Sequence, residues 1–493
     1  MISVDTRQKY IATIGIECHV QLRTKTKLFS GADNDARDKE PNTTISPLCI
    51  GLPGTLPVLN QEAVALAVRA GLALNAGIAP LSRFERKHYF YPDLPLGYQI
   101  TQLDEPIILA GSVTFILPDG NEKTVRIHHA HLEADAGKLT HPSGKDYSLV
   151  DYNRAGTPLI EIVSEADMHS PAEAKAYAQE LYLLMTYADV TDGDLYHGNM
   201  RFDINVSVST SATLGTRTET KNLNSFRSVE RATEYEITRQ IELLERGESI
   251  VQETRGWDEA KQRTVSQRSK ENAHDYRYFP DADLPPVRIA EDMVEATRLA
   301  MSALPGHYRQ VFRQLGLDST VVLALLQSRP ASELVKRLHA AGQMSAAKRT
   351  ALWFAMSASE QLDNDASADV WHNPIPDELF IELTEMVDAN EVNSTAAREL
   401  FLAMQRDGQS PRELAKERNL LQVSDEGAIG IIVDKVLADP ASQKAVEDIR
   451  SGNDKAIGFL VGQIMKQSAG KANPALAQAL IRKKLKITTE GKS

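Results

Sequence analysis

The chain has 493 residues, a formal net charge of −12 and a hydrophobic fraction of 42%. This length exceeds what a single hydrophobic core serves, so we expect a few domains. Only two cysteines occur, which excludes a disulfide framework and a four-cysteine zinc site and indicates a reducing, cytoplasmic location. No apolar run is long enough to span a membrane, and residues 1–10 lack the apolar core of a signal peptide, so we expect no membrane partner.

The first expected strand, residues 11–22, carries the most informative pattern of the chain. Its alternation places Glu17 and His19 on one face and the apolar residues between them on the other. A second strand-like stretch, residues 129–135, has an ionisable residue at every second position. Two such strands would bring oxygen and nitrogen ligands into one site, as a metal-dependent reaction on a phosphate requires. Each pattern alone is also that of an ordinary solvent-facing sheet.

The first 290 residues otherwise mix strands, turns and helices. Further strands are expected at residues 112–117, 124–134, 158–163 and 202–209. A loop rich in proline and glycine is expected at residues 40–60, and helices at 61–75 (capped by Asn60), from the capping box Ser170 to Glu173 onward, and at 225–246. Because strands and helices do not alternate regularly, the pattern favours an α+β fold with a largely antiparallel sheet.

Three prolines within residues 280–286 mark a boundary, after which the apolar periodicity is helical. Helices are expected at residues 424–438 and 453–467, among others. We therefore expect a catalytic domain at residues 1–290, an all-α helical domain at 291–410 and a small all-α tail at 411–493. The acidic net charge does not exclude a nucleic-acid partner, because local patches decide such binding, and the tail ends in a lysine-rich stretch.

Several polar clusters lie between these elements. Lys87 begins a segment of three aromatic residues, Arg154 precedes a strand, Arg201 lies on one, and Lys221 is expected near the start of a helix, where anions bind. Each cluster alone is equally a salt-bridge network. Together they supply the cations and hard metal ligands that phosphoryl transfer needs. There is no P-loop, no Gly-x-Gly-x-x-Gly and no Gly-x-Ser-x-Gly motif.

The chain resembles the B subunit of the aspartyl/glutamyl-tRNA(Asn/Gln) amidotransferase along essentially its full length. The stretches that carry the resemblance are Ile14 to Leu22, Gly51 to Asn60, Tyr89 to Pro95, His131 to Lys138, Asp151 to Leu159, Lys221 to Phe226 and His274 to Asp281. The resemblance implies a cradle-like catalytic domain similar to that of glutamine synthetase, followed by the helical domain and a tail that helps to bind tRNA.

The resemblance also implies an activity and partners. Such a protein uses ATP and Mg²⁺ to phosphorylate the side-chain carboxylate of mischarged Glu-tRNA(Gln) or Asp-tRNA(Asn). Ammonia, which the glutaminase partner (the A subunit) releases from glutamine, then displaces the phosphate to form the amide. The C subunit holds the other two together in a heterotrimer. The alternative is a non-catalytic scaffold that only presents tRNA.

Carried over by motif, the expected metal ligands are Glu17, His19 and Glu133, a set that suits Mg²⁺ and also admits Mn²⁺. The expected catalytic residues, which would contact phosphates or the substrate carboxylate, are Arg154, Arg201 and Lys221. The residues expected to line the cofactor pocket are Lys87, Tyr91, Asp93 and Asn153.

The chain departs from the family at one expected structural feature. Many members carry two cysteine pairs around the loop at 35–45, consistent with zinc, and the corresponding positions here are Ser30, Ala32, Ser46 and Cys49. No zinc is therefore expected, and packing must hold the loop. Ala134 replaces a second acid of the family, but strand alternation puts it opposite Glu133, so no lost ligand is expected.

Overall fold

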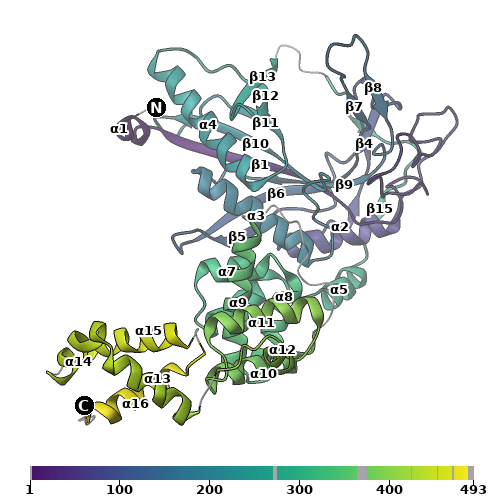
Figure 1. Cartoon of the computed structure of the whole chain (residues 1–493). Coiled ribbons are helices and arrows are strands. Elements are labelled where there is room, and N and C mark those ends of the chain that lie inside the picture. Colours follow the sequence, from purple (N-terminus) through teal and green to yellow (C-terminus); the bar gives the residue numbers. More distant parts are fainter. Residues whose placement is uncertain are drawn as a thin grey trace. The chain divides into compact units, whose positions relative to one another are not determined.

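The structure is a computed structural model that describes residues 3–269, 275–362, 375–422, 425–451, 453–468 and 471–486. The chain forms two compact units, residues 1–307 and residues 308–493. A region with a large mixed sheet is followed by an all-helical region, which confirms the expected α+β class at that level (Figure 1). The three-part division at 290 and 410 stays a prediction. His274 and Lys492 lie outside the described residues.

The strands have the following bounds: β1 Ile11–Gln21, β2 Leu81–Ser82, β3 Glu85–His88, β4 Tyr98–Thr101, β5 Gly111–Ile116, β6 Glu122–Ala134, β7 Lys138–Thr140, β8 Leu149–Asp151, β9 Pro158–Ser164, β10 Met200–Ser209, β11 Thr218–Leu223, β12 Glu253–Asp258, β13 Arg263–Ser269, β14 Phe279–Pro280 and β15 Val287–Arg288. Each strand expected from the alternating pattern is present, with its ends within two residues of the prediction.

The helices have the following bounds: α1 Val4–Gln8, α2 Gln61–Ala73, α3 Pro171–Tyr187, α4 Phe226–Glu245, α5 Glu291–Ala300, α6 Pro305–Gln314, α7 Ser319–Leu326, α8 Arg329–Ala340, α9 Met344–Leu362, α10 Asp377–Asp388, α11 Ser394–Asp407, α12 Pro411–Glu417, α13 Glu426–Ala438, α14 Gln443–Arg450, α15 Ile457–Gln467 and α16 Pro474–Leu485, with short 3-10 turns η2 Pro440–Ser442 and η3 Asp454–Ala456. None of the described helices is long and apolar enough to cross a membrane.

The predicted helix starts at Asn60, Ser170 and Ser225 are confirmed, because each side chain accepts a backbone hydrogen bond from the first turn. The predicted capping box at Ser170 is only half right. Glu173 accepts from the backbone N–H of His169, one residue before the cap, and not from that of Ser170. The expected reciprocal pair is thus displaced by one residue.

Within the described residues the main sheet has eight strands in the order β13-β12-β11-β10-β1-β9-β6-β5. Its neighbours pair antiparallel except β11 and β12, which are parallel, so the expectation of a largely antiparallel sheet is met. Strand β1 lies between β9 and β10 and runs through the middle of the sheet. A smaller sheet of β14, β3 and β4 and the hairpin β7–β8 belong to the same unit (Figure 1).

One face of the sheet is covered by α2, α3 and α4, which contact its strands. The apolar residues of β1 that alternate with the polar ones, Ile14, Ile16, Cys18 and Val20, are at most 1% exposed and belong to this core. Burial of one such aliphatic side chain contributes about 1.5–3 kcal/mol. The strong preference for burying this row fixes the register, so Glu17, His19 and Gln21 must point to the opposite face of the sheet.

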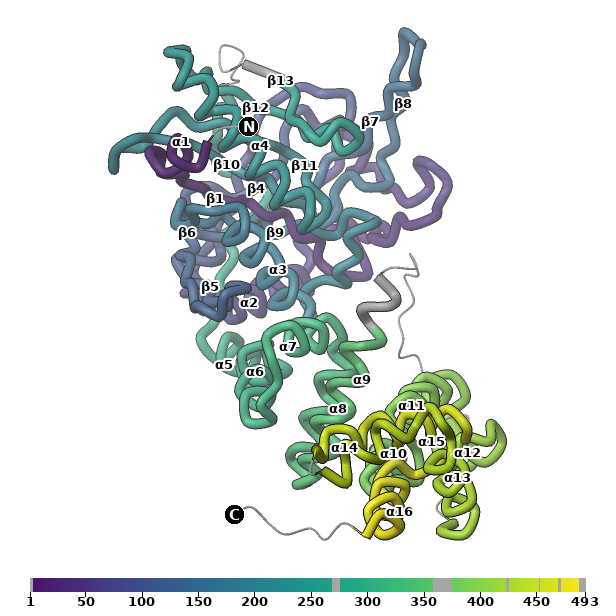
Figure 2. The backbone as a smooth tube through the Cα atoms, turned by 60° about the vertical axis from the view of Figure 1, so that its left-hand side comes forward, coloured from purple at the N-terminus to yellow at the C-terminus, as the bar shows by residue number. Residues whose placement is uncertain are grey.

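The second unit consists of packed helices. Trp353 of α9, Phe380 of α10 and Phe401 of α11 form one aromatic contact group, with ring centroids 5.7 Å and 6.2 Å from Phe401. A separate core lies among α13, α14, α15 and α16, where Ile429, Leu460 and Ile464 are at most 1% exposed. These four helices end the chain and lie together in the yellow part of the tube (Figure 2).

Candidate functional site

Strand pairing places four ionisable side chains in one row across the face of the sheet that the helices leave free. His19 on β1 lies opposite Glu161 on β9 and opposite Arg201 on β10. Glu161 in turn lies opposite His131 on β6. Cross-strand neighbours have Cβ atoms roughly 4.5–5.5 Å apart, so the row is a continuous line of interacting charges.

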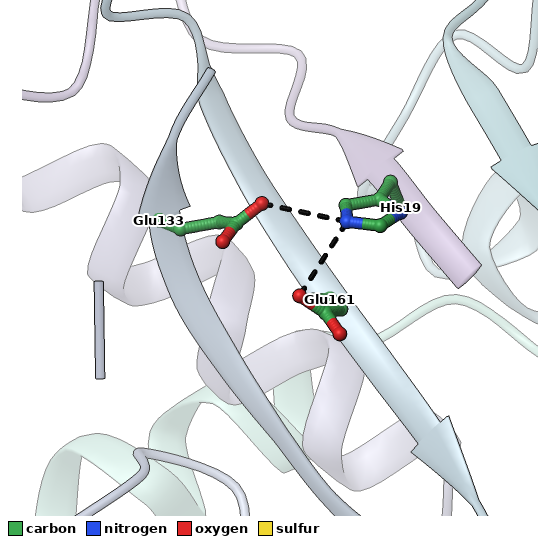
Figure 3. A group of neighbouring side chains, drawn as sticks. All are labelled: His19, Glu133 and Glu161. Carbon is green, nitrogen blue, oxygen red and sulfur yellow. Dashed lines mark ion pairs between the residues drawn. The ribbon is translucent and has the colours of Figure 1, made fainter. Parts of the chain in front are cut away.

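His19, Glu133 and Glu161 converge into a triad that we call the histidine triad (Figure 3). The Nε2 atom of His19 lies 3.5 Å from Glu133 Oε1 and 3.4 Å from Glu161 Oε2. Oxygen and nitrogen ligands about 2.1 Å from one ion lie roughly 3–3.5 Å apart, so these distances fit a shared metal ion. Three protein ligands leave the other coordination positions of an ion free for substrate oxygens.

The opposite charges of His19 and Glu161 stabilise each other's ionised forms. Burial lowers the pKa of His19, but the hydrogen bond to Glu161 and the surrounding carboxylates raise it to about 9. Burial raises the pKa of Glu161, but the hydrogen bond to His19 and the positive charges around it lower it well below its usual value. Without a metal, His19 is therefore a protonated imidazolium at neutral pH. A metal ion bound here would take the place of that proton.

A second group, which we call the acidic triad, consists of Glu17, Asp203 and Glu219. Its carboxylate oxygens lie within 4.8 Å of one another. Burial and the neighbouring charges of Glu161 and Glu219 raise the pKa of Glu17. Residues two apart on a strand are about 6.6 Å apart, and Glu17 faces different neighbours from those of His19. The three expected metal ligands thus divide between two groups: His19 and Glu133 lie together, and Glu17 lies in the acidic triad.

Arg201 and Arg154 share one acid, Asp135. Arg201 donates to Asp135 Oδ2 at 2.9 Å, and Arg154 Nε lies 3.4 Å from the same oxygen. The charge of Asp135 raises the pKa of Arg201. Arg154 also donates to the carbonyls of Ala136 and Gly137, at 3.0 and 2.7 Å, so it holds the loop after β6. Both arginines are held in fixed positions, and Arg201 lies beside the histidine triad.

Lys87, on β3, is close enough to the histidine triad to interact with the charges of its acids. Burial lowers the pKa of Lys87, but the charges of Glu133 and Glu161 and of nearby tyrosines raise it above its usual value. Its ammonium lies 4.9 Å from the centroid of the Tyr276 ring. The negative charges of Glu133 and Glu161 and the face of the Tyr276 ring thus favour the charged form of Lys87.

The remaining residues expected in the cofactor pocket have other contacts. Tyr91 is 49% exposed, and the Asp93 carbonyl accepts from Gly137 N at 2.8 Å. Asn153 is buried and binds the loop: its Oδ1 accepts from Thr43 N and Thr44 N, at 2.7 and 2.9 Å. Asn153 lines, together with Arg154, a cavity at the carboxyl end of β1, and Asp93 lines a small pocket together with Asp135. The expected role of these three residues in cofactor binding stays a prediction.

A cavity of about 520 Å³ opens at the carboxyl end of β1. It is lined by Gln21, Lys138, Arg154 and Asn199, among other polar residues. Small-molecule sites span about 300–1,000 Å³, so the cavity has the size of a ligand site. Because Arg154 lines it and also contacts Asp135, the cavity adjoins the row of charges.

The cysteine that remains at the expected zinc positions is Cys49. Lys27 Nζ lies 3.5 Å from Cys49 Sγ, and the hydroxyl oxygens of Ser46 and Ser30 lie 3.2 and 3.9 Å from it. Lys27 is buried and also donates to the Ala155 carbonyl at 2.7 Å. The Lys27 side chain thus links the loop that carries Cys49 to the backbone next to Arg154. The absence of zinc stays a prediction.

The sequence-based ligand set did not include Glu161, Asp203 or Glu219. Glu161 carried a signal, since it is the single acid in an apolar strand beside Arg154. Asp203 alternates with Arg201 on β10, and Glu219 alternates with Lys221 on β11. What the pattern lacked was the strand order, which alone brings these acids beside Glu17 and His19.

Two family models match this chain. Residues 12–295 match the model described as GatB/GatE catalytic domain, and residues 336–485 match the one described as GatB domain. Among curated relatives, the aspartyl/glutamyl-tRNA(Asn/Gln) amidotransferase B subunit of Caldanaerobacter subterraneus is 45% identical over 480 residues, which are 97% of this chain and 99% of the relative.

Two further proteins with the same printed name are similarly close. That of Geobacter sulfurreducens is 46% identical over 483 residues, or 97% of this chain and 99% of the relative. That of a Synechococcus species is 42% identical over 492 residues, or 98% and 99%. Agreement at this level along nearly the whole length, together with the match of the catalytic-domain model, shows that the chain belongs to the family of B subunits of aspartyl/glutamyl-tRNA(Asn/Gln) amidotransferases.

Proposed function

We propose that this chain carries the ATP-dependent step of a tRNA-dependent amidotransferase. It phosphorylates the side-chain carboxylate of Glu-tRNA(Gln), Asp-tRNA(Asn) or both, and the acyl phosphate then reacts with ammonia to give the amide. The observation that carries the proposal is the histidine triad, His19, Glu133 and Glu161, flanked by the cations of Arg201 and Lys87. Hard ligands beside fixed cations are what phosphoryl transfer needs.

The donor set of the histidine triad suits Mg²⁺ and admits Mn²⁺. A divalent ion held there would neutralise phosphate oxygens of ATP and polarise the γ-phosphorus. Two of the ligands come from neighbouring strands in fixed register and the third, Glu133, accepts from Thr101 Oγ1 at 3.5 Å. Such outer contacts keep the ligand oxygens aimed at one point.

Side chains of the protein contribute to phosphoryl transfer by positioning the reactants and by neutralising charge. The substrate carboxylate has an ordinary pKa near 4, so at pH 7 it is ionised and needs no general base to attack phosphorus. Arg201, which is bound to Asp135, and Lys87, whose ammonium lies against the Tyr276 ring, supply positive charge that neutralises the oxygens of ATP and of the acceptor. Holding reactants in line in this way lowers the barrier without covalent catalysis.

The family relationship supports further parts of the proposal. The sheet domain corresponds to the cradle-like, glutamine synthetase-like catalytic domain, and the chain works in a heterotrimer with the A and C subunits, of which the A subunit supplies ammonia. The tail, residues 411–493, contacts the tRNA. Its last described helix carries Arg482, Lys483 and Lys484, which pair with Asp454, Glu426 and Asp434, acids whose side chains are each more than half exposed. Exposed pairs are weak, so these cations are free to exchange their partners for phosphates.

The test is ATP turnover by the chain assembled with the A and C subunits, with mischarged tRNA and Mg²⁺. Glu133→Gln and Glu161→Gln should each lower tRNA-stimulated ATP cleavage on the order of 100-fold, the upper range for disturbing a metal site. Binding of tRNA and glutaminase activity should stay unchanged. The matched control is Glu122→Gln, at the exposed end of the same strand β6 as Glu133. Unchanged turnover in both triad variants would favour the tRNA-presenting scaffold instead.

A further inference from the structure

The acidic triad already contains a cation that belongs to the chain. Lys221 Nζ lies 3.3 Å from Asp203 Oδ2 and 3.0 Å from Glu219 Oε1. Lys221 and Glu219 alternate on β11 and so share a face, and Asp203 comes from the neighbouring strand β10. The sequence suggested a lysine free to bind an anion at a helix start, but Lys221 is a strand residue bound to two carboxylates.

The other carboxylate oxygens of the acidic triad are held by fixed neutral donors. Asp203 Oδ1 accepts from the backbone N–H of Asn222 at 2.7 Å, and Glu219 Oε2 accepts from Thr254 Oγ1 at 2.9 Å. Each of these two acids therefore presents its second oxygen to the ammonium of Lys221.

The third acid is held in the same way. Glu17 Oε1 accepts from Asn205 Nδ2 at 3.0 Å, which fixes one oxygen of this carboxylate too. Its ligand atom lies within 4.8 Å of those of Asp203 and Glu219. The triad is thus built around a centre that takes a positive charge, and the positive charge beside that centre is Lys221.

A divalent ion and this ammonium compete for the same oxygens. Mg²⁺ requires oxygen ligands at about 2.0–2.1 Å, whereas both inward oxygens of Asp203 and Glu219 are engaged by Lys221. Two cations at one centre repel each other strongly at such short distances. The ammonium has a path out, because the side chain of Lys221 is 38% exposed.

We propose that Lys221 is the resident cation of the acidic triad, and that a divalent ion occupies this triad only by displacing the lysine. Within the described residues, the ion pairs of Glu133 and Glu161 involve the ring nitrogens of His19 and His131 and no lysine, so the histidine triad then binds metal first. A displaced Lys221 becomes available for phosphate oxygens, so loading of the second site and release of this cation are one event. The inference rests on the proposed function only for the identity of the first metal site.

The test is Mn²⁺ binding to the assembled complex, measured by electron paramagnetic resonance. Wild type should bind one Mn²⁺ tightly per chain, and Lys221→Met should bind a second at least tenfold more tightly than wild type does. The control is Lys123→Met, a lysine of the same sheet paired with Glu173 at 3.2 Å, which should bind as wild type does. Adding Glu219→Gln to Lys221→Met should remove the gained ion.

Since Lys221→Met leaves acids unneutralised, melting temperatures with and without Mn²⁺ give a second measure, with Lys221→Gln as a milder variant. Mn²⁺ should raise the melting temperature of both variants more than that of wild type. Equal second-site affinity in wild type and both variants would overturn the inference. If wild type binds no Mn²⁺ tightly, the proposed metal site at His19 is wrong. An ion that is bound by the Lys221 variants and not by wild type would still support the inference in that case.

Discussion

Glu236 of α4 provides the most quantitative test of the physical reasoning, because its carboxylate is completely buried and surrounded by donors. Its Oε2 accepts from Thr218 at 2.9 Å and from Arg239 at 2.8 Å. Its Oε1 lies 3.0 Å from Arg255 Nε and also accepts from Thr264. These contacts join α4 to β11, β12 and β13, the strands that carry and support Glu219.

Glu236→Gln keeps the shape of the side chain but removes its charge. The amide NH₂ then faces donors, and Arg255, whose side chain is 10% exposed, loses one of its two acids. Removing one partner of a buried ion pair costs about 3–5 kcal/mol. We expect the variant to lose stability in this range at pH 7.

The pH dependence follows from the direction of the shift. Burial raises the pKa of Glu236, but the hydrogen bond and charge of Arg239, with Thr264 and Arg255, lower it below its usual value. A group with a depressed folded pKa stabilises the protein above its unfolded pKa, about 4.3 for glutamate, and loses that contribution as the pH falls through the folded pKa. The difference between wild type and Glu236→Gln should therefore be full at pH 7 and narrow below about pH 4.

Hydrogen exchange of the β11 and β12 amides, measured by mass spectrometry from pH 7 down to pH 3, reads the stability of this region separately from the helical unit. The matched control is Glu234→Gln on the same helix, whose carboxylate is 53% exposed and bonded to Arg7, and which should cost less than about 1 kcal/mol. The reasoning is refuted if Glu236→Gln matches wild type at pH 7, or if its deficit stays constant down to pH 3.

Three further predictions concern the site and the tail. Asp135→Asn removes the acid shared by Arg154 and Arg201, so single-turnover ATP cleavage should fall about 10- to 100-fold, while circular dichroism stays unchanged. Gly156→Ala places a side chain at a φ of 82°, which should cost about 1–2 kcal/mol in urea denaturation; an unchanged midpoint would contradict it. Ile464→Ala opens a cavity in the core of α13–α16 and should cost about 2–5 kcal/mol of tail stability, and Mn²⁺ binding should not change.

The elements of the fold were predictable from the sequence because their signals are local. The alternation in β1 and the caps at Asn60, Ser170 and Ser225 depend on residues a few positions apart, and the structure has each of them. Which strand pairs with which depends on long-range packing. The order β11-β10-β1-β9-β6 joins segments up to two hundred residues apart, and no local pattern contains it.

The same limit explains what the sequence could say about the site. The alternation correctly put Glu17 and His19 on the free face, and the family motif added Glu133 to the expected metal ligands. The sequence did not divide these ligands between sites, because neighbours along a strand are visible in sequence and neighbours across strands are not. Glu161 and Glu219 become neighbours of β1 residues only through the sheet order. The family resemblance predicted the type of reaction, whereas only the structure showed that the acids form two separate triads.

Two acidic clusters so close together raise the question of how the domain folds before any metal arrives, since unneutralised buried carboxylates repel one another. In each triad, a positively charged side chain of the protein itself neutralises part of the negative charge. In the histidine triad it is the imidazolium of His19, whose pKa is raised to about 9, and in the acidic triad it is the ammonium of Lys221. If metal ions bind at both triads as proposed, His19 would give up a proton and remain as a ligand, whereas Lys221 would have to move away. Folding of the domain would then not require bound metal, and the two sites would fill by different chemistry.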